Sequence, residues 1–258
     1  MKSLIKSCAL DFLRLISPHL NNQSSILMYH SIGNNPVFFT VRPETFEAQM
    51  KYLIESKFNL VKLSELIRKL KSNENIANHV VVTFDDGYED NFLTAFPVLK
   101  KYNIPATIFI PTGLIGKTNT TSAGEKLPIM TNEMMKEMMM SPLVEFMPHG
   151  VTHNELTSLG REKIKSELAD SQQFLGSFGG NVSVVAYPRG KYNKDIVSLA
   201  TEYYQAGVTV EEGLVSPKNN LYLLPRNSID SSTTFNQFKA KVSGAIGLYQ
   251  KIKKIRFS

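Results

Sequence analysis

The chain has 258 residues, 42% of them hydrophobic, which is enough to bury the core of one α/β barrel or of two small domains. A single cysteine, Cys8, excludes an intramolecular disulfide framework and fits a reducing compartment. The net charge of +6 is modest and no nucleic-acid-binding module is evident, so we expect no nucleic-acid partner.

Both ends of the chain combine basic residues with apolar residues at helix-like spacing. We expect an N-terminal amphipathic segment over residues 1–24, one barrel over 25–245 and a basic tail over 246–258. Such ends either pack on the barrel or bind an anionic membrane surface. Asp11 and Arg14 interrupt the apolar core that a secretory signal needs. We therefore expect a cytoplasmic protein, with peripheral attachment to the inner face of the membrane as one use of these ends.

Strand-like runs alternate with helical patterns between these ends. The expected helices cover residues 43–56, 63–70, 91–102, 131–140, 159–178 and 194–204. The expected strands cover residues 26–29, 80–84, 106–111, 144–147, 182–185, 205–210 and 221–225. Ser64 and Thr131 are expected to cap helices, and the aperiodic segment 113–128 is expected to be a loop. This alternation predicts a parallel sheet, closed or open.

Two adjacent carboxylates, Asp85 and Asp86, end the apolar run 80–84 and are followed by Gly87. Two acids are costly to hold together unless they share a proton or a cation lies between them. The pattern indicates a metal site or an acid–base site. The alternative is a plain turn, because Asp-Gly is a common turn dipeptide.

Two histidines, His149 and His153, follow the apolar run 144–147. Their i, i+4 spacing would place both imidazoles on one side of a helical turn, whereas Pro148 and Gly150 favour a loop between a strand and a helix. Two imidazoles and a carboxylate suit zinc or a similar divalent ion. The alternative is a pair of surface histidines in a polar loop.

A third turn follows the run 182–185 and contains Tyr187, Pro188 and Gly190. A strand that ends in this way can turn sharply and expose backbone N–H groups, which stabilise an oxyanion. Taken alone this signal is weak, since such turns are common.

Together and in this order, the three motifs resemble those of the polysaccharide deacetylase family, also called NodB-homology or carbohydrate esterase family 4 proteins. The matching residues are Thr83 to Gly87 for its first motif, His149 and His153 for its His-x-x-x-His motif, and Tyr187, Pro188 and Gly190 for the Tyr-Pro-x-Gly variant of its third. The resemblance covers residues 26–245. It implies an α/β fold, a distorted (β/α) barrel that usually has seven strands, with all site residues on the face where strands end.

The resemblance also implies roles for single residues. The metal ligands would be Asp86, His149 and His153. The metal would be zinc by default, with cobalt or nickel as alternatives. Asp85 would be the general base, and the backbone N–H of Tyr187 would hold the oxyanion. The substrate contacts would be Tyr187, Pro188 and Arg189. The products would be acetate and a free amine on a sugar.

Two positions depart from the family pattern. The arginine that orients the catalytic aspartate in many members is replaced by Ala186. Arg226, after a later apolar segment, is a candidate to supply that charge, and an ordinary surface arginine is the alternative. No histidine follows His153, so the late histidine that many members use as general acid is absent. His30, at the end of an expected strand, is a candidate for that acid or for a substrate contact.

The sequence thus predicts a metal-dependent hydrolase that removes an N-acetyl group from an amino sugar in a polysaccharide, a glycolipid or a surface-glycan precursor. The alternatives are hydrolysis of another amide or acyl group at the same site, and a non-catalytic glycan-binding relative. A binding protein would have no need of Asp85, which favours the enzyme.

Overall fold

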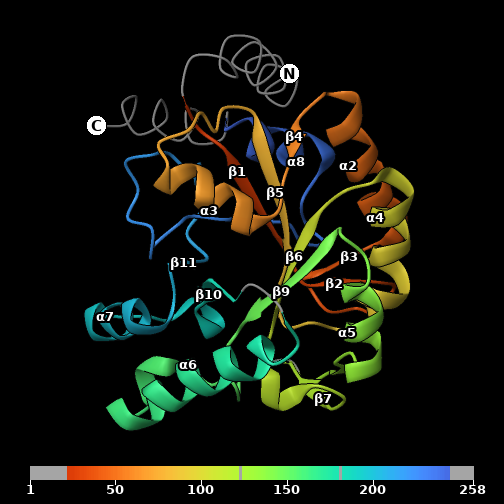
Figure 1. Cartoon of the computed structure of the whole chain (residues 1–258). Helices are drawn as coiled ribbons and strands as arrows, with labels where there is room; N and C mark the ends of the chain where they lie inside the picture. Colours follow the sequence, from red (N-terminus) through yellow and green to blue (C-terminus); the bar gives the residue numbers. More distant parts are fainter. Residues whose placement is uncertain (1–21, 122–123, 180–181, 245–258) are drawn as a thin grey trace, which may run out of the picture.

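A parallel sheet forms the centre of the molecule (Figure 1). The computed structural model describes residues 22–121, 124–179 and 182–244. The strand order is β12-β1-β5-β6-β9, and β4 also pairs with β5. The strands of this sheet are β1 (Ser25–Tyr29), β4 (Asn59–Leu60), β5 (His79–Phe84), β6 (Ala106–Ile110), β9 (Val144–Pro148) and β12 (Asn227–Ser228). In the parallel register Tyr29 lies opposite Phe84, and Phe84 lies opposite Ile108, so the carboxyl ends of these strands meet at one edge.

Two further strands, β10 (Val184–Ala186) and β11 (Ala206–Val208), form a parallel pair beside β9. Leu224 then bridges Val208 in parallel, and the chain continues into β12, next to β1. The five strands of the main path and this pair thus follow one another around a distorted (β/α) barrel of seven strands. Within the described residues β9 and β10 share no ladder. The ring of His149 spans this seam, with Nδ1 2.8 Å from the carbonyl oxygen of Ala186.

Helices cover the sheet on its outer side. They are α2 (Pro43–Glu55), α3 (Leu63–Lys71), α4 (Phe96–Tyr102), α5 (Asn132–Met139), α6 (Arg161–Gly176), α7 (Lys194–Tyr203) and α8 (Phe235–Ser243). Figure 1 shows α2, α4 and α5 along one side, and α6 and α7 beside β10 and β11. Short helical turns are η1 (Asn91–Ala95), η2 (Thr112–Leu114), η3 (Leu156–Ser158) and η4 (Pro188–Gly190). Two small pairs complete the fold, namely β2 (Ser31–Ile32) with β3 (Thr40–Val41), and β7 (Thr118–Thr120) with β8 (Lys126–Pro128).

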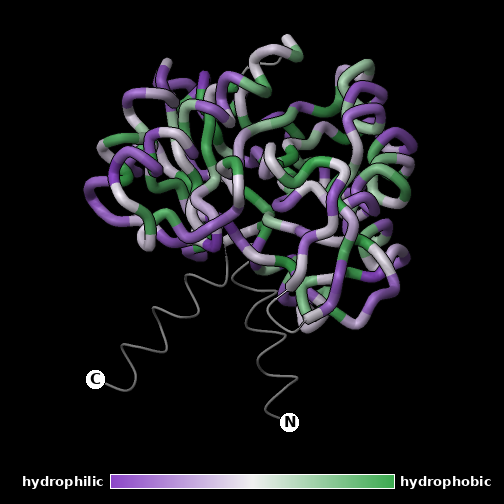
Figure 2. The backbone as a smooth tube through the Cα atoms, turned by 90° about the horizontal axis from the view of Figure 1, so that it is seen from below, coloured by the Kyte–Doolittle hydropathy of each residue, from purple (hydrophilic) through white to green (hydrophobic). Residues whose placement is uncertain are grey.

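The central strands are buried on both faces, which explains why their sequences are continuous apolar runs. Alternate side chains of β5 enter two clusters. Val80 and Val82 pack with residues of α2 and α4, whereas Val81 packs in a cluster that includes residues of α3. Figure 2 shows the hydrophilic stretches mainly on outer loops and helices. Burial on both faces holds the sheet rigidly, so it can position the residues that follow its strands.

The expected helices are confirmed to within a few residues, and Thr131 caps α5 through its side chain. The expected strand over 221–225 is wrong. Asn220 starts a turn there, because its side chain accepts a hydrogen bond from the backbone N–H of Tyr222 at 2.9 Å. The cap at Ser64 is also wrong: Lys62 is the N-cap of α3, and Glu145 from β9 accepts the N–H of Ser64 at 3.0 Å.

The aperiodic segment 113–128 is not wholly a loop, because it contains the antiparallel pair β7 and β8. The expected N-terminal segment 1–24 lies almost entirely outside the described residues, and the expected tail 246–258 lies wholly outside them. Among the helices that are described, none combines the length and the apolar character needed to cross a bilayer.

Candidate metal and catalytic site

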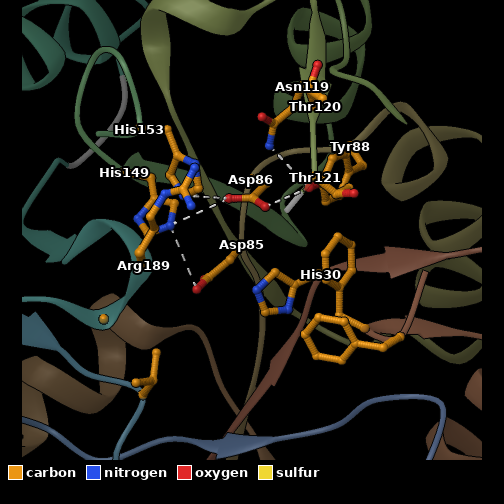
Figure 3. Close-up of a pocket in the computed structure, with 14 residues that line it drawn as sticks. His30, Asp85, Asp86, Tyr88, Asn119, Thr120, Thr121, His149, His153 and Arg189 are labelled. Atoms are coloured by element: carbon orange, nitrogen blue, oxygen red, sulfur yellow. Dashed lines mark hydrogen bonds and ion pairs between the residues drawn. The ribbon is translucent and has the colours of Figure 1, made fainter. Parts of the chain in front are cut away.

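A pocket opens at the edge where the parallel strands end (Figure 3). Part of its polar lining comes from the segments that follow β1, β5 and β9 and from η4: His30, Asp85, Asp86, His149, His153 and Arg189. Strands of one parallel sheet bring together side chains that lie more than a hundred residues apart in the sequence. The fold therefore gathers the predicted motifs at one place.

The Asp-Asp-Gly turn after β5 has an unusual backbone. Asp86 and Gly87 both have positive φ angles, of 69° and 65°. Aspartate tolerates this left-handed conformation better than most residues. A Cβ atom at Gly87 would lie 2.7 Å from the side chain of Ile110, so the position has room only for glycine. The sharp turn lets the two carboxylates face different partners.

Asp85 forms a buried ion pair with Arg226. The guanidinium donates from Nη1 to Oδ1 at 2.6 Å and from Nη2 to Oδ2 at 2.7 Å, while Asp85 is 2% exposed and Arg226 is fully buried. Nε of Arg226 donates to the carbonyl oxygen of Thr209 at 2.9 Å, and this hydrogen bond fixes the orientation of the planar guanidinium group. Burial raises the pKa of Asp85, but the charge and hydrogen bonds of Arg226, together with the nearby imidazoles of His149 and His30, outweigh burial and lower the pKa. Asp85 is therefore an ionised carboxylate with a fixed orientation.

Asp86 faces two imidazoles. Its Oδ1 lies 3.0 Å from Nε2 of His153 and 3.6 Å from Nε2 of His149, and the three ligand atoms all lie within 4.8 Å of one another. Figure 3 shows both rings pointing at Asp86 from the same side. A carboxylate and two imidazoles so placed are a donor set for a divalent ion.

The protonation of this triad fits a metal ion. Nδ1 of His149 is 2.8 Å from the carbonyl oxygen of Ala186, so Nδ1 carries the proton and donates, and the lone pair of Nε2 faces Asp86. Burial lowers the pKa of His149 to about 4, so this ring is neutral near pH 7. Oδ1 of Asp86 is buried, and its close contact within the described residues is with Nε2 of His153 at 3.0 Å. Although burial acts against it, this contact raises the pKa of His153, so a cation that binds between the two groups would take the place of the His153 proton.

Glu167 of α6 holds the loop between the two histidines by hydrogen bonds. This fully buried carboxylate accepts the N–H groups of Val151 at 2.7 Å and of Thr152 at 2.9 Å, and also the hydroxyl of Thr152. Gly150 has a φ of 72°, and a Cβ atom there would lie 3.0 Å from Oε2 of Glu167. His153 itself has a φ of 61°. The buried carboxylate thus compensates a strained loop that carries both imidazoles.

A second chain of hydrogen bonds holds Asp86 from the other side. The hydroxyl of Tyr88 donates to Oδ2 of Asp86 at 2.8 Å and accepts from Nδ2 of Asn119 at 3.2 Å. Asn119 lies on β7, so the small β7–β8 pair holds the tyrosine hydroxyl that donates to Oδ2 of Asp86. Such outer contacts fix the orientation of a metal ligand.

The remaining predicted residues differ in their placement. His30 lines the pocket, and its Nδ1 is buried without a hydrogen-bond partner among the described residues. Arg189 is exposed on the rim with a φ of 55°. Tyr187 and Pro188 are buried behind the pocket and do not line it. The N–H of Tyr187 donates to the carbonyl oxygen of Val208 at a long 3.5 Å.

Sequence reasoning missed Glu167, Tyr88 and Asn119. For Glu167 a signal exists, because it falls on the buried stripe of α6 together with Ile164 and Leu168, where a charged residue is unexpected. Tyr88 immediately follows the Asp-Asp-Gly motif, but nothing in the sequence indicates which way its hydroxyl points. Asn119 carries no local signal at all.

Comparisons with known proteins identify the family. Residues 72–208 match the family model described as polysaccharide deacetylase. YxkH of Bacillus subtilis (strain 168), which is classed with the polysaccharide deacetylases, is 36% identical over 220 residues, or 84% of this chain and 75% of that protein. The poly-beta-1,6-N-acetyl-D-glucosamine N-deacetylase of Staphylococcus aureus (strain MRSA252) is 29% identical over 80% of this chain and 78% of its own length.

Among solved structures, the Streptococcus pyogenes deacetylase PplD in complex with acetate superposes with a TM-score of 0.75. It is 31% identical, and the match covers 85% of this chain and 98% of that one. The resemblance inferred from the three motifs and the expected barrel are thereby confirmed, and the chain belongs to the polysaccharide deacetylase family.

Proposed function

We propose that this protein removes N-acetyl groups from the amino sugars of a polysaccharide by metal-assisted hydrolysis. The observation that carries the proposal is that two adjacent carboxylates have different partners. Asp85 is ionised and held by Arg226, while Asp86 faces two imidazoles less than 4 Å away. The Staphylococcus aureus relative named above as an N-deacetylase supports the same reaction.

Asp86, His149 and His153 would hold the metal. We propose zinc, because two imidazoles and one carboxylate leave an open position of the kind found in catalytic zinc sites; cobalt and nickel are the alternatives. When bound, the ion supplies Lewis acidity that polarises the amide carbonyl and lowers the pKa of a water.

Asp85 acts as the general base in this proposal. Its carboxylate accepts the proton of the attacking water, and Arg226 keeps it ionised and oriented through both of its oxygens. Nε2 of His149 lies 4.0 Å from Oδ2 of Asp85, so the base sits beside the metal ligands. The departure at Ala186 is thus compensated by an arginine from a distant part of the chain.

Two assignments complete the proposed chemistry. His30 protonates the leaving amine or contacts the sugar, since it lines the pocket on the side opposite to His149 (Figure 3). The backbone N–H of Tyr187 would stabilise the oxyanion by exchanging its long, weak hydrogen bond to Val208, at 3.5 Å, for one to the substrate. Arg189 contacts the substrate at the rim, with Tyr187 and Pro188 supporting the turn that carries it.

The finer substrate and place in the cell are also proposals. A glycolipid or a surface-glycan precursor would bring the reaction to the inner face of the membrane, and the basic ends of the chain would then bind the anionic surface from the cytoplasm. Removing residues 1–16 and 246–258 is expected to abolish co-flotation with anionic vesicles. Unchanged flotation of the shortened protein would contradict the membrane contact.

The proposed function is tested by acetate release from a panel of substrates. Metal-stripped protein is assayed with and without added zinc on N-acetylglucosamine oligomers, a lipid-linked N-acetyl sugar and a simple aliphatic N-acetyl amide. Zinc-dependent release from the sugars alone would support the proposal. Release from the simple amide alone would favour another acyl or amide substrate, and tight oligomer binding without release would favour the glycan-binding alternative.

A further inference from the structure

Phe38 lies on the loop between β2 and β3 and is 72% exposed, yet it lines the same pocket as Asp85. A single exposed apolar side chain needs no explanation elsewhere on a protein surface. At this place the exposed ring stands at the mouth of a pocket whose catalytic carboxylate is only 2% exposed. A ligand that covered the ring would release the water in contact with it.

The backbone that carries Phe38 is held by hydrogen bonds from two directions. Within the loop, Oδ1 of Asn35 accepts from the N–H of Val37 at 3.1 Å and from the hydroxyl of Thr40 at 2.6 Å. From a distant segment, Ser231 donates both its N–H, at 3.0 Å, and its hydroxyl, at 2.7 Å, to the carbonyl oxygen of Phe38. A ligand that binds the ring therefore orders little backbone, which reduces the entropic cost of binding.

Phe38 is the outer end of a wall of aromatic rings. It meets Phe39 edge to face, with ring centroids 5.3 Å apart, and Phe39 stacks on Tyr88 at 5.7 Å and lies 5.0 Å from the ring of His30. Tyr88 in turn donates to Asp86. The wall thus runs from exposed Phe38 to the candidate metal ligands. Figure 3 shows two of its members, His30 and Tyr88, on the side of the pocket opposite to the two histidines of the triad.

Polar groups also line the pocket. Asn119, Thr120 and Thr121 of the β7 region lie beside Tyr88, whereas Arg189 of η4 lies near the two histidines of the triad (Figure 3). A pyranose ring has a face of C–H groups and an edge of hydroxyls, so an apolar wall and polar groups around one opening match the two surfaces of a sugar.

We propose that Phe38 is a binding platform for the sugar unit next to the one that carries the reacting N-acetyl group. This inference rests on the proposed deacetylase function. The acetamido group must reach Asp85 at the floor, so a ring that packs on Phe38 at the rim belongs to a neighbouring unit of the same chain. The preferred substrate is accordingly an oligomer or a polymer rather than a single N-acetyl sugar.

The test compares chain lengths in Phe38→Ala. With β-1,6-linked N-acetylglucosamine oligomers from monomer to pentamer, the ratio of kcat/KM for the pentamer to that for the monomer is expected to fall about tenfold. Phe38→Trp is expected to keep the wild-type ratio or raise it. Leu93→Ala is the matched control, because Leu93 is 58% exposed on η1 and does not line the pocket; it should keep the wild-type ratio.

A binding measurement separates this inference from the proposed function. Calorimetry of the pentamer on the Asp85→Asn background, with and without Phe38→Ala, needs no turnover. An affinity about tenfold lower with Phe38→Ala would support the platform even if no acetate were released from any sugar. If Phe38→Ala keeps both the wild-type pentamer-to-monomer ratio of kcat/KM and the wild-type affinity for the pentamer, Phe38 is not a binding platform. This holds whether or not the protein is a deacetylase.

Discussion

Replacing Arg226 with methionine removes the positive charge that faces Asp85 inside the protein. Both partners are nearly inaccessible to water, and two hydrogen bonds of 2.6 and 2.7 Å join them. The variant therefore keeps a buried carboxylate with no counter-charge. Breaking a buried pair in this way costs about 3–5 kcal/mol at neutral pH. At about 2–4 °C per kcal/mol, the melting temperature of the metal-free protein should fall by about 6–20 °C.

The pH dependence of this loss follows from the direction of the pKa shift. In the wild type the pKa of Asp85 is lowered, so the pair stabilises the fold above the usual carboxyl range and loses that effect as pH falls through the lowered pKa. In the variant, burial, which is the largest influence, loses its main opponent, so the pKa of Asp85 rises. The buried carboxyl then takes up a proton on mild acidification, so the difference in melting temperature should shrink as pH falls.

A double variant separates charge from packing. Asp85→Asn combined with Arg226→Met removes the uncompensated charge, so it should be more stable than Arg226→Met alone. Thermal unfolding of the metal-free proteins across pH measures all three. A double variant no more stable than Arg226→Met, or an Arg226→Met protein that melts like the wild type at neutral pH, would refute the reasoning.

Three further predictions concern the metal ligands and their support. His149→Ala or His153→Ala should lose bound metal and acetate release together; an active, metal-loaded variant would remove that residue from the ligand set. Glu167→Ala should weaken zinc binding about 10- to 100-fold in a chelator competition. Glu162→Ala, on the exposed face of the same helix, should leave it unchanged, and equal effects of the two would contradict the proposed support of the loop. Burial favours the neutral form of His153, but Asp86 outweighs it and raises the pKa, so metal must displace a proton and zinc affinity should fall as pH drops below neutrality. A zinc affinity that stays the same from about pH 8 to pH 5 would contradict this prediction.

Much of the fold could be predicted because long apolar runs and helical periods are local signals. The strand before Asp85 and the helix after Thr131 both formed where expected. The failures lie where a side chain from elsewhere decides the local structure. Glu145 binds the start of α3 and displaces the expected cap at Ser64, and no local pattern could indicate this contact. At 221–225 an apolar composition suggests a strand, but the turn set by Asn220 prevails.

In the site, too, the residues with a local sequence signal were predicted, and those placed by distant contacts were not. Residues that directly follow strands were predicted, because parallel strands bring their carboxyl ends together. Arg226 was a candidate because it follows the apolar segment 221–225 and could replace the family's arginine; that segment is not a strand, yet the structure gives Arg226 the expected contact with Asp85. Glu167 was not predicted, although it lies on the apolar stripe of α6 with Ile164 and Leu168. The stripe indicates that it is buried, but only the folded chain shows that it accepts from the backbone between the two histidines.

The adjacent aspartates offer the most direct test of the account. Asp85→Asn and Asp86→Asn are the same chemical change one residue apart, and bound zinc and acetate release can be measured on both proteins side by side. The account predicts that Asp85→Asn keeps its zinc and loses turnover, because it lacks the base, whereas Asp86→Asn loses zinc and turnover together. Substantial turnover in zinc-loaded Asp85→Asn, or full zinc affinity in Asp86→Asn, would contradict the division of labour between the two carboxylates.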